Sequence, residues 1–123
     1  MILVNTETIP GHSIVALRGL VQGNTIRAKN IGRDIGAGLK NLVGGELKAY
    51  TELMTEARTQ AVHRMVDQAQ QLGANAVVNV RFTTSQVAGG AAELYAYGTA
   101  VTVQPDSGPP PQGLPPEQPQ WNT

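Results

Sequence analysis

The stretch Gly73-Ala-Asn-Ala-Val-Val-Asn-Val-Arg-Phe-Thr-Thr84 decides the fold, because it marks the change from a helix to a strand. Gly73 stands where a helix would end, since glycine readily adopts the left-handed conformation that closes many helices. From Ala76 onward the side chains alternate, which predicts a strand with two unlike faces. The apolar face is formed by Ala76, Val78, Val80 and Phe82, and the mixed face by Val77, Asn79, Arg81 and Thr83. A mixed face suits a strand that meets a second subunit or lines a cavity.

The segment before this stretch, Leu47 to Leu72, predicts a long amphipathic helix. Its apolar residues recur at helical spacing along one side: Tyr50, Leu53, Met54, Ala57, Ala61, Met65, Ala69 and Leu72.

A second, earlier helix is predicted from Asn30, which can cap its N-terminus. Ile31, Ile35, Leu39 and Leu42 follow at spacings of four, four and three, which places them on one side of a helix. We expect this helix to stop at Gly44-Gly45.

The remaining elements are predicted strands. Ile2 to Val4 and His12 to Leu20 are apolar and β-branched runs separated by Pro10-Gly11, and we expect the second run to end before Gly23-Asn24. Gly19 within it suggests a β-bulge or a close contact with another backbone.

Leu94 to Val103 is the last predicted strand, and it should pair with its predecessor as a hairpin. The order predicts an α+β domain of plan ββααββ, with two helices covering one face of an antiparallel sheet.

Composition excludes several classes of function. Nine basic and nine acidic residues balance, and no basic run or aromatic platform points to nucleic acid. No cysteine is present, no leader is evident and no eighteen apolar residues run together, so we expect a cytoplasmic protein that is not in the membrane. At this length we expect no more than one domain, residues 1–104, and its core should be modest.

Residues 105–123 form a separate tail, which carries seven of the eight prolines. Such a composition cannot bury enough surface to offset the cost of ordering the chain, so disorder is expected. The tail either is a solvated extension or recruits a partner protein, for which Gly108-Pro-Pro-Pro111 and Trp121 are the candidate contacts.

Several long stretches resemble one known family. They are the stretch quoted first, Asn30-Ile-Gly-Arg-Asp-Ile-Gly-Ala-Gly-Leu-Lys-Asn-Leu-Val-Gly-Gly-Glu46, Val21-Gln-Gly-Asn-Thr-Ile-Arg-Ala-Lys29, Tyr50-Thr-Glu-Leu-Met-Thr-Glu-Ala-Arg58 and Ala96-Tyr-Gly-Thr-Ala100. With them, residues 1–104 resemble the YbjQ-like family of "putative heavy-metal-binding" domains. The resemblance implies a dodecin-subunit-like fold, assembly of the chain with itself into a homopentameric ring, and a divalent or heavy-metal ion as the cofactor.

The candidate metal ligands lie on the polar side of the long helix. Glu52, Glu56, His63 and Asp67 cluster there, and carboxylates and imidazole are legitimate ligands. The two pairs lie about 10 Å apart along the axis, so one ion cannot bridge all four residues. A solvated polar face is the alternative interpretation.

A ligand site is also conceivable between subunits, where polar residues are embedded in apolar patterns. Its candidates are Arg33, Asp34, Glu46, Asn79 and Arg81. No nucleophile motif with a recognisable context occurs, so we expect no enzyme. The sequence therefore predicts a small homo-oligomeric binding protein. The alternatives are a scaffold ring whose tail recruits a partner, and a binder of a small molecule between subunits.

Overall fold

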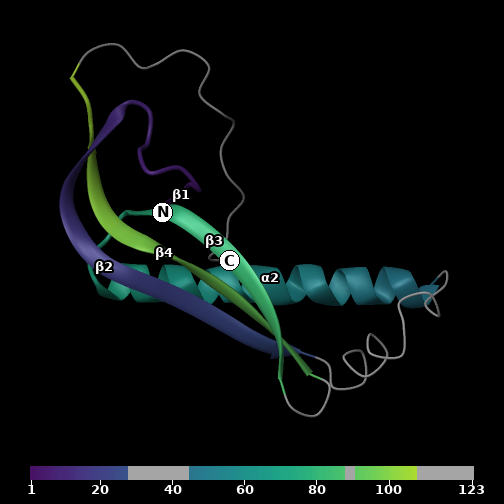
Figure 1. Ribbon diagram of the computed structural model, residues 1–123. Coiled ribbons are helices and arrows are strands. Elements are labelled where there is room, and N and C mark those ends of the chain that lie inside the picture. The colour runs from purple at the N-terminus through teal and green to yellow at the C-terminus, as the bar shows by residue number, and fades with distance from the viewer. Residues whose placement is uncertain (28–44, 88–90, 108–123) are drawn as a thin grey trace.

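The computed structural model describes residues 1–27, 45–87 and 91–107, and it shows an α+β fold (Figure 1). Along the chain come β1 (Ile2–Leu3), β2 (His12–Arg27), α2 (Gly45–Gln71), β3 (Ala76–Val87) and β4 (Ala91–Pro105). The predicted helix from Asn30 to Leu42 lies outside the described residues.

The strands form a single four-stranded sheet in the order β1-β3-β4-β2. β3 and β4 pair antiparallel as the predicted hairpin, and β2 pairs antiparallel with β4. β1 pairs parallel with β3, so the prediction of a wholly antiparallel sheet was wrong. Many residues, α2 among them, separate β1 from β3, which is the kind of connection that parallel pairing requires.

β2 is longer than the sequence predicted, because it continues through Gly23 and Asn24 to Arg27. Gly23 lies where the sheet touches the helix: a Cβ built there would be 2.0 Å from the Ala61 carbonyl oxygen and 2.6 Å from the Met65 nitrogen. The glycine therefore serves close packing and not a turn. The bulge predicted at Gly19 is confirmed by a shift of register between Leu17 and Gly19 and by its φ of 132°.

The C-terminus of α2 closes as predicted at Gly73, whose φ is 80°. The Ala74 N–H donates to the Ala69 carbonyl oxygen at 3.0 Å, and the Gly73 N–H donates to the Gln70 carbonyl oxygen at 3.0 Å. This pair of bonds is the Schellman motif. It turns the chain sharply, and β3 starts three residues later at Ala76.

The main core lies between α2 and one face of the sheet. α2 packs chiefly on β2, less on β4 and little on β3. Small residues let the two layers approach closely, in keeping with the shortage of aromatic side chains. The buried residues of this cluster are Leu3, Val21, Ala61, Val62, Met65, Val66, Ala69, Val77, Ala96 and Ala100.

Figure 1 shows the N-terminal part of α2 running out past the strands. Ala57 and Ala61 are fully buried, whereas Leu53 and Met54, one turn earlier, are only half-buried. The apolar side of the helix thus extends beyond the sheet that covers it.

A bulge in β3 overturns the predicted alternation of its two faces. The register of the β3–β4 pairing shifts between Val78 and Arg81, and Asn79 has a φ of 55°. Val80 consequently packs against the same cluster as Val77, on the helix side, while Ala76 and Val78 belong to a second cluster on the other side. The predicted face of Ala76, Val78, Val80 and Phe82 is therefore divided between both sides of the sheet.

Candidate functional site

Two features of the described chain could support binding: a pocket beside the β3 bulge, and the sheet face that α2 leaves uncovered.

The pocket forms where β1 ends and β3 continues alone. Beyond β1 the N-terminal segment stays beside β3, since the Val80 N–H donates to the Val4 carbonyl oxygen at 3.0 Å and the Asn79 N–H donates to the Thr6 carbonyl oxygen at 2.9 Å. The bulge exposes these donors to the segment. Arg81 completes the attachment, because its Nη1 donates to the Asn5 carbonyl oxygen at 2.8 Å and to the Val80 carbonyl oxygen at 3.1 Å.

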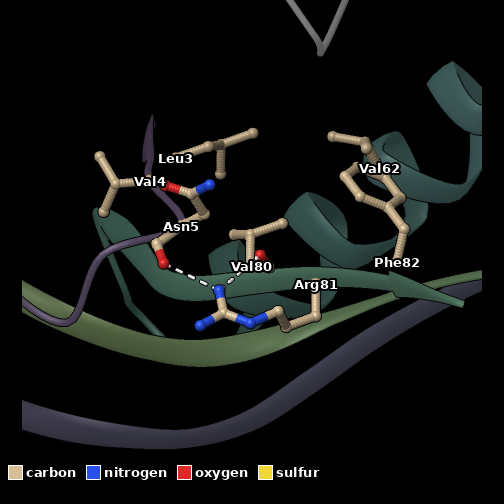
Figure 2. A pocket seen from close by; sticks show the side chains of 7 residues that line it. All are labelled: Leu3, Val4, Asn5, Val62, Val80, Arg81 and Phe82. Atoms are coloured by element: carbon tan, nitrogen blue, oxygen red, sulfur yellow. Dashed lines mark hydrogen bonds between the residues drawn. The ribbon is translucent and has the colours of Figure 1, made fainter.

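The resulting pocket has a volume of about 560 Å³. Figure 2 shows the N-terminal residues on one side of it, Val62 and Phe82 on the other, and Val80 between them. Among the described residues that line it, all are apolar except for one with an amide and one with a guanidinium. The lining residues are Leu3, Val4, Asn5, Val62, Val80, Arg81 and Phe82.

The second feature is the sheet face opposite α2. Part of it is covered by Ile9, which joins Val101 and Val103 in a small buried cluster. Further along β2 the apolar side chains are open to solvent: Leu17 is 75% exposed, Leu20 85% and Ile26 58%. Leu17 pairs with Val101 across the strands, so both side chains belong to the same face.

Two tyrosines extend this open face on β4. Tyr95 and Tyr97 lie with ring centroids 5.5 Å apart, and Tyr97 is exposed. The Tyr95 hydroxyl donates to the Gln22 side-chain oxygen on β2. Leucine, isoleucine and tyrosine side chains thus form a broad surface of the kind that monomeric proteins rarely expose.

The outer edge of β2 is partly occupied by side chains from α2. Gln68 Oε1 accepts a bond of 2.9 Å from the Gln22 N–H, and Arg64 Nη1 donates to the Asn24 carbonyl oxygen at 2.5 Å. These bonds satisfy backbone groups that an edge strand would otherwise offer to another chain. Contact with another chain across this edge is hindered at Gln22 and Asn24.

The predicted metal ligands all lie on α2, where Glu52, Glu56 and Asp67 are exposed and His63 is half-buried. Within residues 1–27, 45–87 and 91–107, no three His, Asp or Glu side chains come together in a group that could hold a metal. His63 and Asp67 remain one helical turn apart, close enough to share an ion as two of its ligands. Their role as ligands stays a prediction.

Of the predicted residues of the intersubunit site, the structure describes Asn79 and Arg81. Asn79 lies in the bulge of β3, and Arg81 follows the bulge and lines the pocket. Arg33, Asp34 and the side chain of Glu46 lie outside the described part of the chain. Sequence reasoning missed Leu3, Val4 and Val62, because no local signal shows that the N-terminal strand lies beside β3.

The fold is that of a small α+β domain. The chain belongs to the YbjQ family: the family model described as "Putative heavy-metal-binding" matches residues 1–104. Neither that description nor the names of the relatives below state an enzymatic activity. No helix in the described part of the chain is long and apolar enough to cross a bilayer.

The chain has relatives of high identity in several organisms, and each of the three below is called a UPF0145 protein. The chain is 62% identical to one from Hahella chejuensis over 104 residues, which cover 85% of this chain and 100% of the relative. It is 61% identical to one from Halorubrum lacusprofundi, covering 85% of this chain and 100% of the relative. It is 57% identical to one from Archaeoglobus fulgidus, covering 85% of this chain and 96% of the relative.

Among solved structures, a crystal structure from Pediococcus pentosaceus is similar in fold. It is a protein of unknown function of the DUF74 family, and the TM-score is 0.51 at 17% identity. The match covers 85% of this chain and 98% of that one.

Proposed function

We propose that the protein is a non-enzymatic binding protein that acts as a ring-shaped homo-oligomer, a pentamer as the family resemblance implies. The observation that carries this is the open sheet face, where Leu17 and Leu20 are almost fully exposed in the isolated subunit. Burying one such side chain stabilises an assembly by about 2 kcal/mol. Copies of the same chain are the natural cover, because a chain of this size gains stability by association.

The test is a double substitution of this face, Leu17→Lys with Leu20→Lys. Charges at both positions would be buried without partners in an assembly, so we expect the double variant to dissociate into folded single chains. Native mass spectrometry and circular dichroism at equal chain concentration measure mass and folding. Gln71→Lys at the exposed C-terminal end of α2 is the control, and its mass should equal that of the wild type. A double variant that keeps the wild-type mass would contradict the proposal.

Heavy-metal binding is the second part of the proposal, and the family description supports it. His63 and Asp67 supply two donors from one subunit, so a complete ligand set would need donors from neighbouring copies. Elemental analysis of protein purified without added metal should find a transition or heavy metal. His63→Ala should lose it, while His12→Ala should retain it. Metal-free wild-type protein that also fails to bind added zinc or copper would refute this part.

A scaffold function is the competing proposal, supported by the proline-rich tail and its Trp121. Deleting residues 106–123 should then abolish capture of a partner protein without changing the free energy of unfolding. Unchanged capture by the shortened chain would refute the scaffold function and leave the binding function standing.

A further inference from the structure

We propose that the pocket beside the β3 bulge binds an amphipathic organic anion, with its apolar chain between Val62, Val80 and Phe82 and its anionic group toward Arg81. The site lies within one subunit, so this inference does not rest on the proposed assembly or on a metal.

The apolar part of the ligand follows from the lining. Five of the seven described lining residues are aliphatic or aromatic, and they come from three different elements and the segment after β1. Pockets that bind small molecules have volumes of about 300 to 1,000 Å³ and are mostly apolar with few polar groups. The volume of about 560 Å³ falls within that range.

The charge of the ligand follows from Arg81. Among the described residues that line the pocket, Arg81 alone carries a charge. Its two hydrogen bonds both leave from Nη1 and end on backbone carbonyl oxygens, and no acidic side chain in the described ranges pairs with it. The guanidinium is therefore a cation without an acidic partner at the edge of the pocket, where it can attract a carboxylate or a similar anion.

The position of Arg81 is fixed before any ligand arrives. One carbonyl acceptor lies on β3 itself, and the other belongs to Asn5, whose neighbours Val4 and Thr6 accept hydrogen bonds from β3. A guanidinium held in this way loses little conformational freedom on binding. The same two bonds also attach the N-terminal segment to β3. A test must therefore separate the loss of the Arg81 charge from the loss of this attachment.

The experiment compares three probes with apolar chains of similar length and different head groups: octanoate, octan-1-ol and octylammonium. Binding to the full chain is measured by isothermal titration, and methyl NMR shifts of the valine and leucine residues locate the site. We expect octanoate to bind at least about tenfold more tightly than octylammonium, with shifts at Leu3, Val62 and Val80. Equal binding of the two ions, shifts elsewhere, or no binding by folded protein would each overturn the inference.

Phe82 offers a substitution that leaves Arg81 and its bonds in place. Its side chain is 47% exposed, so Phe82→Glu should fold and should weaken octanoate binding by about tenfold or more through repulsion. Phe82→Leu is the matched variant and should bind within about threefold of the wild type. Arg18→Gln removes an exposed arginine that does not line the pocket and should leave binding unchanged. If Phe82→Glu binds octanoate as the wild type does, the ligand does not occupy this pocket.

Discussion

At the scale of single residues, Gly23 carries the closest contact between the helix and the sheet. The Ala61 carbonyl oxygen and the Met65 nitrogen are backbone atoms, so neither can rotate away from an added methyl group. We therefore expect Gly23→Ala to lower the free energy of unfolding by about 2–4 kcal/mol. Urea unfolding at a fixed chain concentration measures this.

Gly73→Ala is the comparison for that variant. No described atom would lie within 4 Å of its Cβ, and only its positive φ opposes alanine. We expect Gly73→Ala to lower the free energy of unfolding by about 1 kcal/mol. If Gly23→Ala were no more harmful than Gly73→Ala, the close approach of β2 to α2 would be wrong.

Thr25 is a second residue whose environment makes a prediction. Its side chain is 3% exposed, and its hydroxyl oxygen has no hydrogen-bond partner among the described residues. Thr25→Val keeps the shape and removes the unsatisfied group. The free energy of unfolding should rise by about 1 kcal/mol. Destabilisation in the same urea assay would mean that the hydroxyl has a partner that the described residues do not supply.

At the scale of elements, the bulge in β3 decides which side chains reach the pocket. Asn79 adopts a left-handed conformation that asparagine tolerates and a β-branched residue does not. Asn79→Val should lower the free energy of unfolding by about 1–2 kcal/mol and should weaken attachment of the N-terminal segment. Amide hydrogen exchange should show faster exchange at Val4 and Val80, whereas Asn79→Gly should resemble the wild type.

The same bulge shows how far the sequence could predict the fold. Helix α2, its end at Gly73, the bulge at Gly19 and the β3–β4 hairpin were predicted correctly, because local spacing and glycine chemistry determine them. The bulge at Asn79 was missed because its cause is the backbone of residues 4–6, far away in sequence. The parallel pairing of β1 was missed for the same reason, and with it the pocket.

At the scale of the whole molecule, the two faces of the described sheet are covered unequally, and Ile9 covers only part of the face opposite α2. α2 shields one sheet face, and its first turns run past the strands (Figure 1). The opposite face exposes leucine, isoleucine and tyrosine side chains, while side chains from α2 occupy the β2 edge at Gln22 and Asn24. Face contacts between copies would cover both the open sheet and the projecting helix.

Sedimentation equilibrium of the full wild-type chain at micromolar concentration tests this account most directly. The account predicts a single species with the mass of five chains of 13.0 kDa each, folded by circular dichroism. A folded species with the mass of one chain would contradict it, because the open sheet face would then be stable in water without a partner.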